Sequence, residues 1–537
     1  MGRAHAFPVR GRHARRLAMD LPRHQPRRQP DRGAGRRPVP HRGRPDRREA
    51  GDPQAAPGHS RRHRARPCRE MRAAMQAIEK RAGALPYDPL YDPVTARGLG
   101  PRSDYAPTYW IGTAGAPPPD DGPVTGDMDA DVVVIGSGYT GLSCALHLAK
   151  MHGIKAVVLE ANGVAYGCST RNGGQAQVSS GRLKRSQWIE RWGLDVARRL
   201  HAEVCEGFDL FRGLIRDHAI DCDPQDGGHY YIAHKASAMP ALEKETALLR
   251  DTFGYDARMI SRDELHETVA RDQEAHGAMW EADGVGIHAA KLAFGYLRAA
   301  RELGARVHVD SPVQGWKYRN GVHHLRTPGG TVRARRVAVA TAAYAPRSLH
   351  PRLRDRLMPI MSNSIVTRVL TPAELEAVGI RKLSPLTDTR TLRHYYRLLP
   401  DNRLQIGSRA AITGRDAANP AHLDALREGM ARKFPALRGI ALDYSWWGWV
   451  DVSHDMMPRI TGLPDLPGAF YALGYGGNGV MYSAMAGRRM AQLVAGEAVP
   501  DLPIFNNELP HEGWRTPFRR LGQWGLYQFY HYRDERR

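Results

Sequence analysis

A glycine pattern between a predicted strand and a predicted helix constrains this chain more than any other feature. Asp131–Ile135 is a short run rich in β-branched residues, typical of a buried parallel strand. Gly136, Gly138 and Gly141 follow it as G-x-G-x-x-G, and apolar spacing predicts a helix over Tyr139–Met151. The segment therefore reads as strand, tight turn and helix.

Each glycine has a physical role in that setting. Gly136 permits the turn out of the strand, Gly138 lets a pyrophosphate approach the backbone, and Gly141 lets helix and strand pack closely. The second predicted strand, Ala156–Leu159, ends in Glu160, where a carboxylate can bind ribose hydroxyls. The pattern predicts a dinucleotide site without separating FAD from NAD; the alternative is three glycines in an ordinary turn.

Length and charge set further bounds. A chain of 537 residues exceeds one average domain, and no run of 18 apolar residues predicts a membrane span. Of the net charge of +22, residues 1–70 carry +14, with 20 arginines and no lysine. The cysteines show no paired metal-ligand spacing, so we expect reduced thiols in a cytoplasmic protein and no metal. They are Cys68, Cys144, Cys168, Cys205 and Cys222.

Residues 1–70 are rich in Arg, Pro, Gly and His and show no apolar periodicity, so they are predicted to be disordered. Three interpretations stay open: a nucleic-acid-binding arm, an ordinary disordered extension, or a spurious extension upstream of a true start at Met71 or Met75. Residues 71–128 are predicted to be an arm or linker that begins with a helix over Met71–Ala82. Tyr105, Tyr109 and Trp110 are candidates for pinning it to the globular body.

The rest of the chain alternates predicted helices and strands, and residues 346–458 are expected to form a separate antiparallel sheet. Helices are predicted at Ser186–His218, Pro240–Phe253, Ala289–Leu303 and Ala421–Phe434, and strands at His229–Ala233, Arg306–Val309, Val337–Ala340, Ser364–Leu370, Tyr395–Leu399 and Arg403–Gly407.

Two glycine-rich loops stand out beyond the first motif. Gly167–Gln175 combines small residues, hydroxyls and one arginine, which suggests a loop along the cofactor; a plain turn is the alternative. Near the end, the strand Phe470–Leu473, the loop Gly474–Val480 and the helix Met481–Ala495 form a second predicted anion- or dipole-binding feature.

With these motifs placed, the chain resembles the D-amino-acid-oxidase-like (DAO) superfamily of FAD-dependent oxidoreductases, and within it most resembles γ-glutamylputrescine oxidoreductases, enzymes of putrescine catabolism. The resemblance runs from about Ser103 to Asn507. Its specific parts are Ser103-Asp104-Tyr105 with Trp110, Asp131–Ala145, Gly167–Gln175, Asp401-Asn402-Arg403 with Gly407, Asp455 with Pro458, and Gly474–Val480.

The resemblance implies an α/β and α+β fold: a Rossmann-like FAD-binding domain carrying the GxGxxG, interleaved with an antiparallel-sheet substrate domain. The expected FAD-binding domain is 129–225, 285–345 and 460–500; the substrate domain is 226–284 and 346–459; residues 501–537 are a C-terminal extension.

It also implies which residues hold the cofactor. Those expected at the ADP half are Gly136, Gly138, Gly141 and Glu160, with Val313 at the adenine; those expected at the ribityl chain and ring are Ser169, Arg171, Asn172 and Gly173; those expected at the flavin pyrimidine edge are Gly476, Gly477, Asn478 and Gly479.

Two positions depart from sarcosine oxidases of the superfamily. Gly448 stands where some of them carry a cysteine joined to flavin, so noncovalent FAD is expected. Gln405 is the nearest match to their oxygen-activating lysine, which leaves O2 and a quinone or dye both open as electron acceptor.

The implied chemistry is oxidation of a C–N bond in a small amine or amino acid, with hydride transfer to flavin and hydrolysis of the imine to an aldehyde or oxo acid. Arg397, Arg409 and Tyr395 are the candidate substrate residues, because an arginine can pair with a substrate carboxylate. Tyr396 lies in the same presumed substrate sheet, and His229, Asp455 and Trp447 are weaker candidates.

Three alternatives stay open. Within the family the alternative is a sarcosine, glycine or D-amino-acid dehydrogenase. A flavin hydroxylase using NADPH is disfavoured because no second G-x-G-x-x-G is present. A nucleic-acid-binding flavoprotein would act through the basic tail, although no specific nucleic-acid partner is expected.

Overall fold

The computed structural model describes residues 91–96, 104–511 and 513–535. The predicted tail over 1–70, the predicted helix Met71–Ala82 and Cys68 lie outside these residues. Within the described ranges, no helix combines the length and the apolar character needed to cross a bilayer.

The first large sheet is built around β1 (Met128–Ile135), whose last four residues are buried. β1 pairs in parallel with β12 (Thr331–Val339) and with β2 (Val157–Leu159), and parallel pairing continues outward to β19 (Ala469–Leu473) and β9 (Arg306–His308). Antiparallel strands complete it: β10 (Gly315–Arg319), β11 (Val322–Arg326) and β18 (Arg459–Gly462). The β-branched run at Asp131 therefore forms the predicted central parallel strand.

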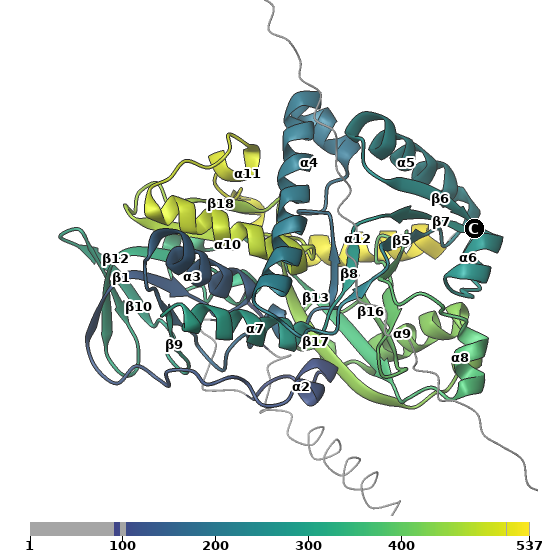
Figure 1. Cartoon of the computed structure of the whole chain (residues 1–537), viewed down its shortest axis with the longest axis horizontal. Helices are drawn as coiled ribbons and strands as arrows, with labels where there is room; N and C mark the ends of the chain where they lie inside the picture. The colour runs from purple at the N-terminus through teal and green to yellow at the C-terminus, as the bar shows by residue number, and fades with distance from the viewer. Residues whose placement is uncertain (1–90, 97–103, 512, 536–537) are drawn as a thin grey trace, which may run out of the picture. The chain divides into compact units, whose positions relative to one another are not determined.

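Three helices cover this sheet, with α3 (Tyr139–His152) between α7 (Ala289–Glu302) and α10 (Gly479–Ala495) (Figure 1). α3 and α10 approach closely because Gly487 has no side chain: a Cβ there would lie 2.6 Å from Ser143 Cβ. This packing places the N-termini of two helices on the same side of the sheet.

The second large sheet has the strand order β17-β13-β16-β15-β14-β5-β7-β6. The strands of residues 346–458 pair antiparallel with one another, as expected. They do not form a separate sheet, because β14 pairs in parallel with β5. The chain forms β5 to β7, passes through the first sheet, and returns as β13, which lets β14 join β5 in the same direction. The bounds are β5 (His229–Ile232), β6 (Ala257–Ser261), β7 (Gly277–Glu281), β13 (Leu357–Thr367), β14 (Leu386–Asp388), β15 (Tyr395–Leu398), β16 (Leu404–Arg409) and β17 (Leu442–Ser453).

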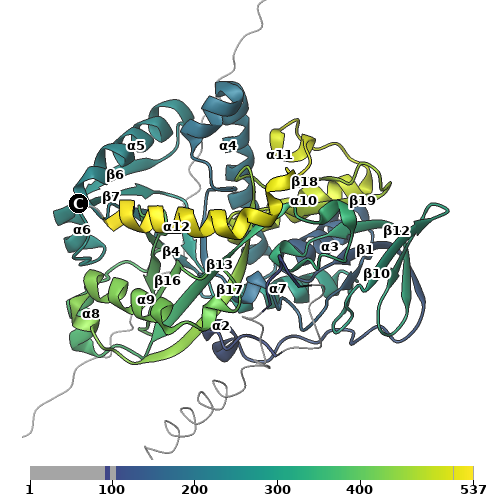
Figure 2. The ribbon, with the colours of Figure 1, turned by 180° about the vertical axis from the view of Figure 1, so that it is seen from behind.

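Among the elements that were not predicted, two are large. β17 carries three tryptophans and pairs along almost all of β13. α12 (Arg519–Glu535) lies across the second sheet (Figure 2), where only a C-terminal extension was expected. Apolar residues are spread around most of α12, so no single apolar stripe marks it in the sequence.

The remaining elements connect these layers. α4 (Arg185–Asp217) runs between the two large sheets and is interrupted at Gly193, which has a φ of 79°. The small sheet β3-β8-β4 comprises Gln175–Gln177, Gly284–Gly286 and Gln225–Asp226. The other helices are α2 (Tyr109–Thr113), α5 (Met239–Phe253), α6 (Arg262–Thr268), α8 (Pro372–Val378), α9 (Pro420–Lys433) and α11 (Pro503–Asn506).

Candidate active site

A cavity of about 670 Å³ lies where the two large sheets meet. From the first sheet it is lined by the β1–α3 turn, the end of β2 and the start of α10; from the second it is lined by parts of β15, β16 and β17. The volume falls within the range of sites that bury a small molecule or cofactor.

The predicted glycine turn forms one wall of this cavity. Gly136 has a φ of +102°, and a Cβ there would lie 2.7 Å from the Ala340 carbonyl oxygen. A Cβ at Gly138 would lie 3.1 Å from Ser169 Oγ, and one at Gly141 would collide with the Gly136 carbonyl. The turn thus leaves a cradle of bare backbone at the N-terminus of α3, suited to a phosphate group.

Glu160 lies at the end of β2 and lines the cavity, as does Val313. Glu160 Oε2 accepts hydrogen bonds from Ser137 N at 2.9 Å and from Ser137 Oγ at 2.7 Å. Glu160 Oε1 accepts one from Asn162 N at 3.2 Å. The carboxylate is therefore held in place beside the glycine turn.

The loop over residues 167–175 contributes Ser169, Arg171, Asn172 and Gly173 to the cavity wall. Ser169 Oγ accepts a hydrogen bond from Tyr139 N at 3.0 Å, which ties the loop to α3. Arg171 Nε donates to the Tyr166 carbonyl oxygen at 3.1 Å, so this guanidinium is held against the wall.

Two tryptophans support the same loop from behind. Trp110 Nε1 donates to the Asn172 carbonyl oxygen at 2.8 Å, and Trp446 Nε1 donates to the Arg171 carbonyl oxygen at 2.9 Å. Tyr109 and Trp110 are buried, so this part of the arm is pinned to the body. Trp446 was not predicted, because nothing in the sequence relates β17 to this loop.

The second glycine loop lies opposite. Gly476, Gly477, Asn478 and Gly479 all line the cavity, and α10 begins at Gly479, so the positive end of its dipole faces inward.

Asp451 of β17, which was not predicted, fixes this second loop. Its Oδ2 accepts from Gly474 N and its backbone oxygen accepts from Gly476 N, both at 2.7 Å. Burial raises the pKa of Asp451 to about 7.

Three arginines and a tyrosine also line the cavity: Arg182, Arg393, Arg409 and Tyr395. Burial and the neighbouring charge of Arg393 lower the pKa of Arg409 to about 10. Arg393 Nε has no hydrogen-bond partner among the described residues. Tyr395 OH lies 3.1 Å from Ser362 Oγ and 2.8 Å from Ser364 Oγ. An anionic ligand would relieve the repulsion between the positive charges of Arg409 and Arg393.

Of the predicted substrate residues, the structure places Tyr395 and Arg409 at the cavity but not Arg397. Arg397 donates to Gln225 Oε1 at 2.7 Å and to the Ile287 carbonyl oxygen at 2.6 Å, and its guanidinium lies 5.3 Å from the centre of the Trp110 ring. It shares a face of β15 with Tyr395, but it lies two residues further along, beneath the arm. Arg397 therefore joins internal segments and does not line the cavity.

Acidic groups line the cavity as well. Glu281 of β7 is 2% exposed, and burial raises its pKa to about 7. Glu245 of α5 also lines the wall. His229, a weaker candidate, lies beside Glu281 with 4.0 Å between Nδ1 and Oε2, and burial lowers the pKa of His229 to about 3. The cavity thus contains groups of both charges.

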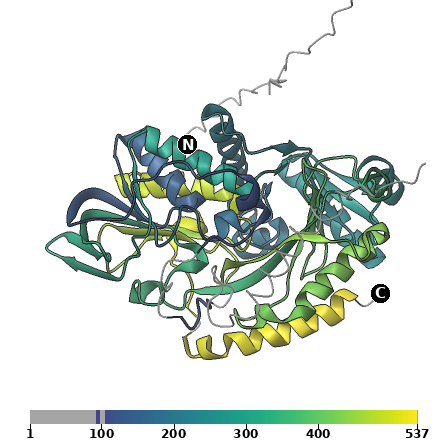
Figure 3. The same cartoon turned by 90° about the horizontal axis from the view of Figure 1, so that it is seen from below.

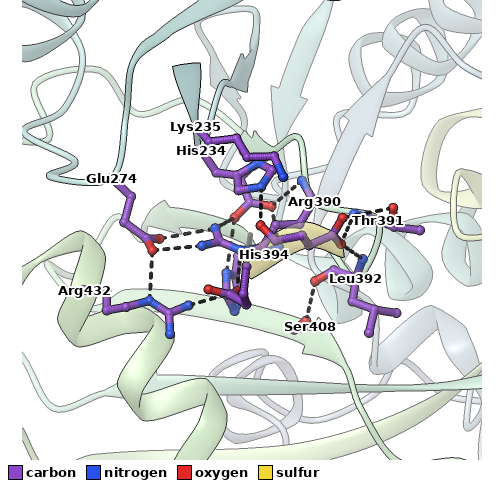
Figure 4. A network of polar contacts seen from close by, with 12 residues as sticks. His234, Lys235, Glu274, Arg390, Thr391, Leu392, His394, Ser408 and Arg432 are labelled. Atoms are coloured by element: carbon purple, nitrogen blue, oxygen red, sulfur yellow. Dashed lines mark hydrogen bonds and ion pairs between the residues drawn. The ribbon is translucent and has the colours of Figure 1, made fainter. Parts of the chain in front are cut away.

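A network of polar contacts holds the loop that carries Arg393 (Figure 4). Asp388 accepts from His394 N at 2.9 Å and from Arg390 Nη1 at 2.6 Å. From α12, Asp534 Oδ2 accepts from Thr391 N at 2.6 Å and from Leu392 N at 3.3 Å. The loop is therefore fixed on both sides of Arg393.

A buried lysine, Lys433, adds two ion pairs to this network. Lys433 Nζ of α9 lies 3.2 Å from Asp388 Oδ2 and 3.2 Å from Glu274 Oε2. Glu274 also pairs with Arg390 at 2.8 Å and with Arg432 at 2.9 Å (Figure 4). None of these groups was predicted, since they come from three separate segments of the chain.

Comparison with known proteins identifies the class. The family model described as "FAD dependent oxidoreductase" (DAO) matches residues 131–493, and the chain belongs to this family. It is 33% identical over 427 residues to gamma-glutamylputrescine oxidoreductase of Escherichia coli strain K12, covering 78% of this chain and 97% of that protein.

A second relative and a solved structure are also similar to this chain. The chain is 30% identical over 380 residues to the probable oxidoreductase OrdL of Haemophilus influenzae, with 70% of this chain and 85% of the relative covered. The crystal structure of glycine oxidase from Geobacillus kaustophilus matches with a TM-score of 0.59 at 20% identity, covering 69% of this chain and 96% of that one. The structural likeness confirms the fold of a Rossmann-like FAD-binding domain with a second sheet domain.

The cavity suits the cofactor of this family. Two glycine loops leave backbone N–H groups and two helix N-termini at its wall, and a Cβ at Gly138 would enter the cradle. Gly448 lines the wall without a reactive side chain, and a Cβ there would lie 3.0 Å from Arg171 Cβ. Gln405 lies outside the cavity, where its Oε1 accepts from Arg397 Nε at 3.4 Å.

Proposed function

We propose that this FAD-dependent oxidoreductase oxidises a C–N bond of an amine that also carries a carboxylate, with a γ-glutamylputrescine-like molecule as the substrate class. The observation that carries the proposal is the cavity wall, where Arg393 and Arg409 stand with Glu281 and Glu245. A substrate with an anionic end and an amine would find a partner for each group in one cavity. The similarity to the Escherichia coli gamma-glutamylputrescine oxidoreductase supports the same substrate class.

The residues proposed to hold FAD are those of the two glycine loops and the loop over 167–175. Gly136, Gly138 and α3 would receive the pyrophosphate, Glu160 the ribose, and Val313 the adenine. The N-terminus of α10 would face the flavin ring, where fixed N–H donors stabilise negative charge. We propose that binding is noncovalent, because Gly448 offers no nucleophile.

When bound, FAD would supply the hydride acceptor for the substrate carbon that bears the amine. The chain's own residues orient that carbon: Arg393 and Arg409 hold the carboxylate, and Tyr395 lies against Gly173, where a Cβ would be 2.7 Å from its ring. A substrate ammonium must lose a proton before hydride leaves. Glu281, with a pKa near 7, is the proposed acceptor of that proton. The imine formed adds water and divides into an aldehyde or oxo acid and ammonia or an amine.

We propose O2, a quinone or a dye as the electron acceptor, and a cytoplasmic location. A sarcosine, glycine or D-amino-acid dehydrogenase is the alternative within the family, since such a substrate also has a carboxylate. The nucleic-acid alternative depends on residues 1–70, which lie outside the described residues.

Anaerobic flavin bleaching tests the proposal without assuming an acceptor. Purified enzyme is mixed with γ-glutamylputrescine, free putrescine, sarcosine, glycine and D-amino acids. We expect γ-glutamylputrescine to bleach the flavin fastest. Faster bleaching by a small amino acid would favour the alternative, and no bleaching by any amine would contradict the proposal.

Arg409→Lys sharpens the test. A charge-assisted contact with a carboxylate contributes about 2–3 kcal/mol, so KM for γ-glutamylputrescine should rise roughly 30- to 150-fold with FAD still bound. KM for free putrescine, which lacks the carboxylate, should barely change. Equal losses on both amines would point to structural damage instead of carboxylate binding.

The proposed noncovalent attachment has its own test. Acid precipitation should leave all the yellow colour in the supernatant as FAD, because Gly448 replaces the reactive cysteine. Flavin retained in the precipitated protein would refute it.

A further inference from the structure

The outer side of α12 exposes a set of large apolar side chains. Each is 51–65% exposed, whereas no other large apolar side chain among the described residues exceeds 47%. We call this set the α12 face: Phe518, Leu521, Trp524, Leu526, Phe529 and Tyr532. Soluble monomers rarely expose a contiguous apolar patch of this kind, and such patches are often functional.

The helix itself is docked on the protein. Its buried residues recur at helical spacing and include Gln523, Tyr527 and Asp534, and Asp534 bonds the loop that carries Arg393. Arg520 donates to the Pro359 carbonyl oxygen of β13 at 2.9 Å. Figure 3 shows α12, the yellow helix along the lower edge, with one side toward the second sheet and one side turned outward. The exposed face is therefore a fixed surface.

We propose that the α12 face is a dimer interface and that its occupant is the same face of a second copy of this chain. Gly522 and Gly525 lie on the exposed side, and a Cβ at either would meet no atom within 4 Å. Small residues at the centre of a helix surface let a second helix approach closely, with Leu521 and Phe529 on either side. A twofold axis through this point pairs two α12 helices in antiparallel fashion.

The available area agrees with this occupant. α12 has 17 residues, so the face is about 26 Å long. An aromatic side chain presents roughly 150–250 Å², so four aromatic residues and two leucines at half exposure offer about 500 Å² of apolar surface. With a polar rim, that approaches the roughly 800 Å² per partner of a standard interface.

The charges favour a second copy over an anionic lipid surface. Residues 519–535 carry three arginines and two acids. Arg519 pairs with Asp355 and Arg520 with Asp92, so these two cations point into their own protein. An interfacial membrane helix needs a basic flank, which α12 lacks among its described residues.

Sedimentation velocity of the full chain over a concentration series tests the proposal. We expect a dimer for the unchanged enzyme, and a dimer dissociation constant at least about 100-fold higher for Leu521→Asp with Phe529→Asp, because two central apolar contacts are lost. Leu194→Asp, a 39% exposed leucine on α4, is the matched control and should leave the dimer intact. Leu521→Met with Phe529→Leu should also keep it.

FAD content and melting temperature show whether each variant is folded. Flotation with vesicles of anionic phospholipid distinguishes the other occupant. A chain that stays monomeric at every concentration overturns the proposal, whether it binds vesicles or not. A folded double-aspartate variant that remains dimeric also overturns it, because the interface must then lie elsewhere.

Discussion

Two parts of the cavity wall are built in different ways. The part proposed to hold the cofactor is made of backbone: the turn at Gly136 and Gly138 and the loop at Gly476 each come from one contiguous segment. The part proposed to contact the substrate is made of side chains, with Arg393 and Arg409 from different segments of the second sheet. The first part would bind the cofactor that the family shares, whereas the second can change with a few side chains.

The largest expected effect is on FAD binding, at the part of the cavity wall that is made of backbone. Gly138→Val should leave the protein folded but lower FAD affinity by at least about 100-fold, because the side chain enters the cradle beside Ser169. The measurement is the flavin-to-protein absorbance ratio after gel filtration. Gly126→Val, where a Cβ would meet no atom within 4 Å, is the control and should keep its FAD. Normal occupancy in Gly138→Val would show that the cradle does not hold the cofactor.

A variant of Arg397 tests whether this arginine belongs to the part of the wall proposed to contact the substrate. Arg397→Lys removes hydrogen bonds from Gln225 and the Ile287 carbonyl, so the free energy of unfolding should fall by about 2–3 kcal/mol in urea titrations. KM should stay nearly unchanged, in contrast to Arg409→Lys. A raised KM with unchanged stability would mean that Arg397 reaches the substrate after all.

Asp534 tests whether α12 positions the loop that carries Arg393. Asp534→Ala leaves Thr391 N and Leu392 N without their acceptor, so KM for a carboxylate substrate should rise about 3- to 10-fold with kcat little changed. Glu302→Ala, which removes a 63% exposed carboxylate on α7, is the control and should leave KM unchanged. An equal fall in kcat with unchanged KM would argue against a positioning role.

The smallest effect concerns Asp451. Its pKa of about 7 means that the folded protein keeps the proton while the unfolded chain ionises near pH 4. This contribution to stability is therefore complete below about pH 4 and is lost as the pH rises to about 7. Asp451→Asn cannot ionise and keeps an acceptor for Gly474 N. The fall in melting temperature between pH 5 and pH 7.5 should shrink by roughly 2–4 °C relative to the unchanged enzyme; an identical fall in both proteins would contradict the raised pKa.

The same contrast explains what the sequence could predict. The turn at Gly136 and the helix start at Gly479 are local patterns, so their structure and place at the cavity follow from neighbouring residues. Arg393 and Glu281 reach the cavity only because β14 pairs with β5, a contact between distant segments. Arg397 looked equivalent to Arg409 in sequence, and its contacts with Gln225, the Ile287 carbonyl and Trp110 distinguish it. The residue types indicated a sheet rich in arginine, but they did not show which guanidinium already had hydrogen-bond partners inside the protein.

The hydrogen bonds from Trp110 and Trp446 to the loop over 167–175 have an optical consequence. Both indoles lie directly behind residues that line the proposed flavin site, so they are placed to transfer excitation energy to a bound flavin. Tryptophan emission should therefore fall as apoenzyme takes up FAD, and the fall should weaken in Trp446→Phe. This would let cofactor loading be followed in real time with the protein's own fluorescence, without an added label.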